Sequence, residues 1–224
     1  HTGYHVREGS KPTLGAWVSY GLGSLNHQLP KFVVMGNSVG GCCGGEFAHG
    51  ANYLGPHHAG VKLSTDPDNP LPFVAPKGNV TAAEAASELD LIGKLNRASG
   101  IEYPNDPQLT ARIRSYELAA GMQTAVPDIM RMDRETEATR RLYGLDQEHS
   151  REFGTQCLAA RRMVEKGVRF IQIYHGAGSA GSWDAHSDIK KNYDVEAPKV
   201  DQPIAGLLKD LKQRGMLENT LVVF

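Results

Sequence analysis

The sequence predicts an α/β protein whose sheet is at least partly parallel. Near the carboxyl end, an apolar strand at 168–174 leads into a Gly/Ser-rich loop. A helix then starts at Asp201 or Pro203, and a second apolar strand starts at Thr220. Strand, helix and strand in this order form a right-handed βαβ unit with parallel strands. The apolar run 29–35 predicts a further buried strand.

Helices are expected to fill much of the remaining chain. Thr81 and Glu84 have the spacing of a capping box, in which each residue bonds to the other's backbone N–H at the start of a helix. Pro127 is expected to end a helix, because proline lacks the N–H that the helix needs. The expected helices cover residues 12–24, 81–100, 106–127, 133–143 and 150–167. Residues 36–76 show no period and predict a long irregular segment.

Composition narrows the class of protein and of partner. The chain has 224 residues and a mass of 24.3 kDa, which suits one large α/β domain or two small ones. Lys and Arg total 24 against 25 Asp and Glu, so no global basic field exists to bind nucleic acid or anionic lipid. No apolar stretch is long enough to cross a bilayer, and no signal segment opens the chain. We expect a soluble protein with no nucleic-acid partner and no membrane partner.

The loop that follows the 168–174 strand holds the first candidate site. Asp184 and His186 are separated by one residue in a glycine-rich segment, so both side chains can turn toward one centre. A carboxylate and an imidazole are suitable ligands for zinc or a similar divalent ion. The alternative is a solvated loop in which Asp184 is a structural cap and His186 is incidental. A further alternative is an unrelated α/β enzyme that uses His175 or His186 as a general base.

Other chemistry-bearing residues give weaker signals. Gly36 to Gly45 follows a strand but has neither the phosphate-loop lysine nor the dinucleotide-binding register. Cys42 and Cys43 predict neither a disulfide framework nor a zinc site, and as nucleophiles they would need a partner base. Two arginine pairs on expected helices, Arg140-Arg141 and Arg161-Arg162, favour solvated faces with acidic neighbours such as Glu137 and Glu165. Six histidines lie before residue 60, and we expect surface or loop positions for His1, His5, His27, His49, His57 and His58.

Short motifs spread over nearly the whole chain resemble those of one family. They are GAWVSYGLG at 15–23, LPKFVV at 29–34, SYELA at 115–119, LYG at 142–144, CLAARR at 157–162, GVRF at 167–170, WDAH at 183–186, DLKQRG at 210–215 and TLVV at 220–223. Taken jointly, they resemble an uncharacterised bacterial family that is often labelled sulfatase-like and belongs to the alkaline phosphatase superfamily.

The resemblance implies a three-layer αβα fold with a mainly parallel sheet, alkaline phosphatase-like and incomplete at both ends. It implies a single domain over 1–224, with an irregular excursion at 36–80 and a helical segment at 81–166. The chain starts at His1 without a methionine and stops on an apolar strand, so we expect a fragment of a longer protein. The alternative is a natural chain whose last strand completes the sheet.

The resemblance also implies a metal-dependent hydrolase of phosphate or sulfate esters, with Zn, Ca or Mg as the divalent ion. Its substrate would be a small-molecule or polysaccharide ester, and the protein would be exported.

Asp184 and His186 are the metal ligands that the resemblance carries over to this sequence. The nucleophile and most ligands are expected in an acidic segment before His1 and in Glu-Phe-Gly-Arg and Gly-Arg-Asp-His stretches after the final strand. The formylglycine motif of sulfatases proper does not match Cys42-Cys43-Gly44-Gly45. The alternative function is that of a non-catalytic binding or surface protein that retains the fold.

Overall fold

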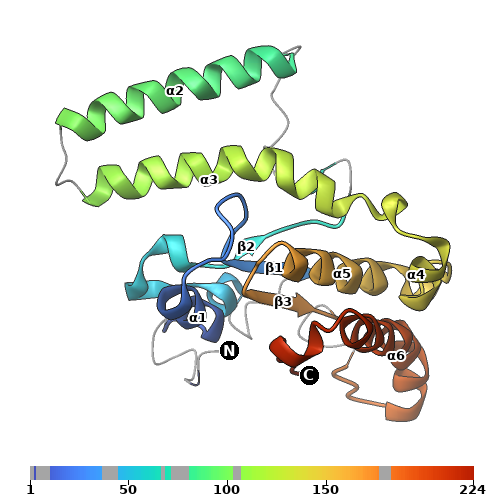
Figure 1. Ribbon diagram of the computed structural model, residues 1–224. Coiled ribbons are helices and arrows are strands. Elements are labelled where there is room, and N and C mark those ends of the chain that lie inside the picture. The colour runs from blue at the N-terminus through green and yellow to red at the C-terminus, as the bar shows by residue number, and fades with distance from the viewer. Residues whose placement is uncertain are drawn as a thin grey trace.

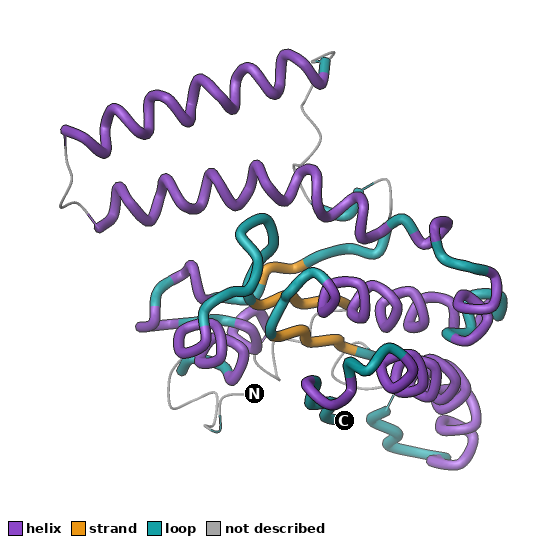
Figure 2. The backbone as a smooth tube through the Cα atoms, viewed as in Figure 1, coloured by secondary structure: helices purple, strands orange, loops and turns teal. Residues whose placement is uncertain are grey.

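The computed structural model describes residues 3, 11–36, 45–66, 69–71, 81–102, 107–176 and 183–224. Within this part, helices surround a small sheet, as Figures 1 and 2 show. The strands are β1 (Phe32–Gly36), β2 (Val61–Lys62) and β3 (Phe170–Tyr174). The α-helices are α1 (Leu14–Leu22), α2 (Ala82–Glu102), α3 (Pro107–Met130), α4 (Glu137–Leu142), α5 (Glu148–Glu165) and α6 (Ile189–Gln213). Short 3-10 turns are η3 (Gly45–His49), η4 (Asn52–Leu54), η5 (Pro56–His58), η6 (Met132–Arg134) and η7 (Leu217–Asn219).

The described sheet is parallel throughout and has the order β2-β1-β3. Phe32 of β1 pairs with Phe170 of β3, and Gly36 pairs with Tyr174. Both strands therefore end at the same edge, which is where ligands bind in open parallel sheets. The prediction of an α/β class with parallel strands is confirmed. The strand β2 was not predicted, because a strand of two residues is too short to show a periodic pattern in the sequence.

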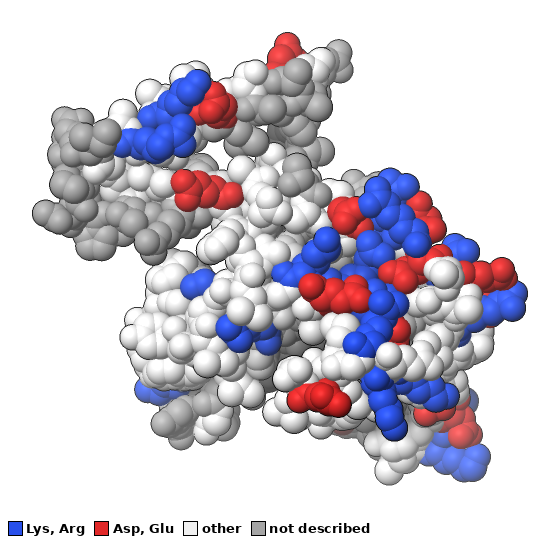
Figure 3. Space-filling model, in the orientation of Figure 1, with Lys and Arg blue, Asp and Glu red and all other residues white. Residues whose placement is uncertain are grey.

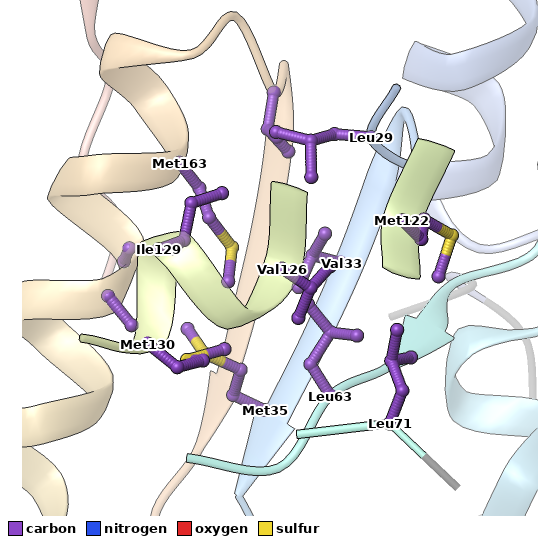
Figure 4. Packing of buried hydrophobic residues seen from close by; sticks show 13 residues of the cluster. Leu29, Val33, Met35, Leu63, Leu71, Met122, Val126, Ile129, Met130 and Met163 are labelled. Atoms are coloured by element: carbon purple, nitrogen blue, oxygen red, sulfur yellow. The ribbon is translucent and has the colours of Figure 1, made fainter. Parts of the chain in front are cut away.

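Each face of the sheet packs against a different set of helices. Val33 and Met35 of β1 point into the main core, where they meet Val126 and Ile129 of α3 and Met163 of α5, as Figure 4 shows. All five side chains are almost fully buried. On the opposite face, the rings of Phe32 and Phe170 meet edge to face with centroids 5.1 Å apart, and α1 covers them so closely that a Cβ atom at Gly15 would lie 2.6 Å from the Phe32 ring. Alternation along β1 thus gives the sheet two covered faces.

The helix α6 packs closely against α5, and its glycine allows contact with the end of α4. A Cβ atom at Gly206 would lie only 2.4 Å from the carbonyl oxygen of Leu142. The ring of Tyr143 is fully buried beside this contact, and its hydroxyl donates a hydrogen bond of 2.9 Å to Asp210 of α6. The start of α6 is linked to the carboxyl end of β3 through Trp183, whose ring contacts both Tyr193 of α6 and His175 directly after β3.

Several helix boundaries agree with expectation. Thr81 and Glu84 form the predicted capping box, with Glu84 Oε2 2.8 Å from Thr81 N and Thr81 Oγ1 3.3 Å from Glu84 N. The helix that follows is α2, which runs beside α3 away from the rest of the molecule (Figure 1). The helix expected at 150–167 is α5, and Gly167 directly after it has a positive φ of 86°.

Three other boundaries were predicted wrongly. The helix α3 passes through Pro127 to Met130, because its buried neighbours Val126 and Ile129 hold the last turn against the core. The helix expected at 133–143 is divided into η6 and α4, since Thr136 caps a new helix by accepting from Thr139 N. The helix expected from Asp201 or Pro203 starts at Ile189, so it contains both Pro198 and Pro203.

The strand expected from Thr220 does not form. Residues 220–224 carry no strand pairing, and Leu221, Val223 and Phe224 are exposed. A strand needs a hydrogen-bonded neighbour as well as apolar side chains, and the described sheet ends at β3. Of the expected βαβ unit, the structure contains the first strand, β3, and the helix, α6, whereas residues 220–224 do not form the second strand.

Candidate functional site

The segment after β3 brings Asp184 and His186 together at the carboxyl edge of the sheet. His186 Nε2 lies 2.9 Å from Asp184 Oδ2. Both side chains are open to solvent, with 59% of Asp184 and 71% of His186 exposed. The two residues predicted as metal ligands therefore point at one another on an accessible surface.

The hydrogen bond within this pair fixes which ring nitrogen carries the shared hydrogen. A carboxylate oxygen accepts hydrogen bonds, so Nε2 of His186 is the donor. Nδ1 is then the nitrogen that does not face Asp184. The pair can act as an imidazole oriented by a carboxylate, or as a nitrogen and an oxygen that share a metal ion in place of the hydrogen.

A divalent ion fits this pair of donors. Bonds from zinc to imidazole nitrogen and to carboxylate oxygen are about 2.0–2.2 Å long, so two atoms 2.9 Å apart can reach the same ion. The described residues contain no group of three or more histidine, cysteine, aspartate or glutamate side chains that could hold a metal. Within that part of the chain, Asp184 and His186 are a two-ligand set.

His175 lies between the sheet and this segment. Trp183 Nε1 donates a hydrogen bond of 2.9 Å to His175 Nδ1. Because an indole nitrogen is only a donor, Nδ1 must be unprotonated and its lone pair is occupied. Burial lowers the pKa of His175, and Lys199 lowers it further against the opposite influence of Glu196 and Glu152. In this geometry His175 offers no free lone pair for the general-base role.

Comparison with known proteins places the whole chain in one family. The model of the family described as "Protein of unknown function (DUF1501)" matches residues 1–224. The chain belongs to the DUF1501 family. Comparison with curated proteins gave no match, and comparison with solved structures gave none.

The histidine-rich first half of the DUF1501 chain forms a second polar cluster. His58 was expected at the surface, yet it is 6% exposed, and its Nδ1 lies 3.0 Å from Ser19 Oγ. Burial is the main reason that its pKa is lowered, with smaller contributions from His57 and Lys31. Ser19 is buried on α1, so this pair is a structural contact between α1 and η5. His27 is exposed as predicted; His1 and His5 lie outside the described residues.

The glycine-rich segment falls mostly outside the described residues, as do Cys42 and Cys43 within it. Cys157 is the free cysteine within the described part. Burial raises the pKa of its thiol to about 12. A thiol with that pKa is almost entirely protonated at neutral pH, so Cys157 is a core residue and not a nucleophile.

One arginine pair of the DUF1501 chain differs from expectation. Arg161 is 2% exposed, and its guanidinium contacts Glu165 at 2.7 Å, Glu135 at 2.9 Å and Asp210 at 3.0 Å. The prediction of a solvated Arg161 was wrong, because α6 and η6 cover that side of α5. The expected exposed pairing of Arg141 with Glu137 is confirmed. Figure 3 shows acidic and basic side chains interleaved over the α4 to α6 side, whereas the α1 side is largely uncharged.

Sequence reasoning missed the role of Trp183. It is one of two tryptophans in the chain, and a tryptophan directly before Asp184 in a glycine-rich loop was the available signal. The missing information was its partner, because His175 lies eight positions away and only the fold brings the two rings together.

Proposed function

We propose that this DUF1501 protein is a metal-dependent hydrolase of phosphate or sulfate esters, and that Asp184 and His186 hold its divalent ion. The observation that carries the proposal is the 2.9 Å approach of Asp184 Oδ2 and His186 Nε2 on an exposed segment. The segment follows β3 at the carboxyl edge of a parallel sheet, the usual position of a site in this class of fold. The family match is compatible with the proposal but names no activity.

Each residue of the pair has a distinct part in this function. Asp184 supplies an anionic oxygen and His186 a neutral nitrogen donor; the imidazole favours Zn, whereas Ca or Mg would be held mainly by the carboxylate. A bound divalent ion would act as a Lewis acid on a phosphoryl or sulfuryl oxygen. The pair is open to solvent, so a small-molecule or polysaccharide ester can approach it.

The proposal includes an alkaline phosphatase-like, three-layer αβα fold and an exported protein. The observations that support the fold are the parallel sheet and its two helix-covered faces. In this proposal the nucleophile and further ligands come from outside the described residues. Among the described residues, no helix is both long and apolar enough to cross a bilayer.

Metal binding tests the proposal directly. The purified full-length protein is dialysed against Zn²⁺, Ca²⁺ or Mg²⁺, and bound metal is measured by elemental analysis. We expect one bound ion per chain, with affinity at least about tenfold weaker in Asp184→Asn and in His186→Ala. Asp194→Asn is the matched control, because Asp194 is also exposed and ion-paired but lies on α6. Equal affinity in all four proteins would refute the ligand assignment.

Activity separates hydrolysis from metal binding alone. We expect the full-length protein to hydrolyse an aryl phosphate or aryl sulfate, and to lose that activity after chelation. Activity that survives chelation and is lost in His186→Ala would favour the general-base alternative. A folded protein with neither metal nor turnover would favour a non-catalytic binding protein. The exposed apolar side chains of Leu14, Trp17, Tyr20 and Tyr53 are the observation that supports this second candidate.

A further inference from the structure

The geometry points to Trp183 and His175 as positioning residues for the segment that carries Asp184 and His186. We infer that the hydrogen bond from Trp183 Nε1 to His175 Nδ1 fixes this segment, so that the Asp184–His186 pair is already formed before any ligand binds. The consequence for metal affinity rests on the proposed function, but the positioning itself does not.

The acceptor of this hydrogen bond is attached directly to the sheet. His175 follows Tyr174, the last residue of β3, and β3 pairs with β1 over five consecutive residues. Phe153 of α5 meets the His175 ring edge to face with centroids 5.0 Å apart. The imidazole is therefore held both by the strand before it and by a helix, and it offers Nδ1 at a fixed place.

The donor is held on its other side by α6. The rings of Trp183 and Tyr193 have centroids 5.6 Å apart, and those of Trp183 and His175 are 5.8 Å apart. Trp183 thus joins α6 to the end of β3 through an aromatic contact and a hydrogen bond. Asp184 follows it in the chain, so only one peptide unit separates the anchored ring from the proposed ligand.

A second fixed point of the segment, the N-cap of α6, lies just beyond His186. Asp188 caps α6, with its Oδ1 accepting from Lys191 N at 3.2 Å, and it adopts a left-handed backbone with φ of 47°. Asp184 and His186 therefore lie on a short stretch between two fixed points. A short stretch fixed at both ends has few conformations to lose when it binds a ligand, and pre-organisation of this kind raises affinity.

A spectroscopic experiment tests the positioning without metal. In ¹H–¹⁵N spectra the chain gives an indole signal for each of Trp17 and Trp183, and Trp183→Phe identifies the second. We expect the Trp183 indole N–H to exchange slowly with water in the wild type and quickly in His175→Leu, whose side chain accepts no hydrogen bond. His175→Asn restores an acceptor near the position of Nδ1, and we expect partial recovery. We also expect one defined set of His186 ring signals in the wild type and averaged signals in His175→Leu.

Zinc affinity is the second measurement. We expect Trp183→Phe and His175→Leu each to weaken Zn²⁺ binding by about two- to tenfold, the effect of losing one hydrogen bond. The double variant should be no weaker than either single variant, because both remove the same interaction. Trp17→Phe is the matched control, since Trp17 lies on α1 in a separate aromatic contact with Tyr20 and Tyr53.

The outcomes distinguish this inference from the proposed function. Fast indole exchange in the wild type, or unchanged His186 signals in His175→Leu, would overturn the positioning role. A wild type that binds no Zn²⁺ but shows a protected indole N–H lost in His175→Leu would support the positioning and refute the metal site. Additive losses in the double variant would show that the two residues act separately, which would also overturn the inference.

Discussion

Replacing Arg161 with alanine is the substitution whose cost follows most directly from the structure. Arg161 is almost completely buried and contacts three carboxylates, those of Glu135, Glu165 and Asp210. Removing one partner from a buried ion pair typically costs about 3–5 kcal/mol, because the other charge is left buried without compensation. Here the lower end applies, since Asp210 keeps its bond from Arg214 at 2.7 Å.

We therefore expect Arg161→Ala to lower the free energy of unfolding by about 3 kcal/mol at pH 7. This is a large part of the about 5–15 kcal/mol that stabilises an ordinary domain. Urea unfolding followed by far-UV circular dichroism measures the difference. Arg141→Ala is the matched control, because Arg141 and Glu137 are 64% and 68% exposed, and such pairs contribute at most about 1 kcal/mol.

The pH dependence gives a second test of the same network. Burial alone would raise the pKa of Glu135, but the hydrogen bond from Arg162 and the close ion pair with Arg161 lower it below its ordinary value of 4.5. A carboxyl whose pKa is lowered by folding stabilises the protein above its unfolded pKa, and this contribution is lost as the pH falls through the folded value. Wild type and Arg161→Ala should therefore approach one another in stability below about pH 4.5. A cost at pH 7 no larger than that of Arg141→Ala would refute the reasoning.

Two further predictions concern packing and a buried histidine. A Cβ atom at Gly154 would lie 2.2 Å from the carbonyl oxygen of Tyr143, so Gly154→Ala should lower the free energy of unfolding, measured by urea titration, by about 1–3 kcal/mol. At Gly93 in the middle of α2, the described side-chain atoms within 4 Å belong to the flexible end of Arg97, and Gly93→Ala should stabilise by about 0.5–1 kcal/mol; destabilisation by both would contradict the packing argument. Folding lowers the pKa of His58 below 6.5, so its unfolded state binds more protons and stability should fall as the pH drops from 6.5 toward the lowered value. His58→Gln should flatten that slope in thermal unfolding between pH 7 and pH 5, and an unchanged slope would rule out His58 as its source.

The elements with strong local signals were predictable. The capping box of Thr81 and Glu84 and the apolar run of β1 both formed as expected, since each depends on residues close in sequence. One part of the proposed site, the Asp184–His186 pair, could be proposed from the sequence, and another part, the partner of Trp183, could not. The one-residue spacing brought Asp184 and His186 forward as candidates, and their 2.9 Å contact agrees with that spacing. Trp183 could not be assigned a partner, because no local pattern links it to His175.

The wrong predictions share a cause in tertiary contacts. Pro127 carries a local signal for the end of a helix and Pro203 for the start of one, yet each lies inside a helix that packs against the rest of the molecule. A proline removes one backbone hydrogen bond, and packing along the same helix compensates for that loss. The apolar pattern at 220–224 predicted a strand, but strand formation depends on a neighbour that local sequence does not specify.

The sequence by itself determined the α/β class, the positions of most helices, the near-neutral charge and the choice of Asp184 and His186 as a candidate pair. These properties depend on composition, periodicity and short spacing, which are local quantities. Only the tertiary structure decided the strand order β2-β1-β3, the burial of Arg161 and His58, and the contact of Trp183 with His175. Each of these depends on which distant segments meet, and desolvation and hydrogen bonding act only after they have met.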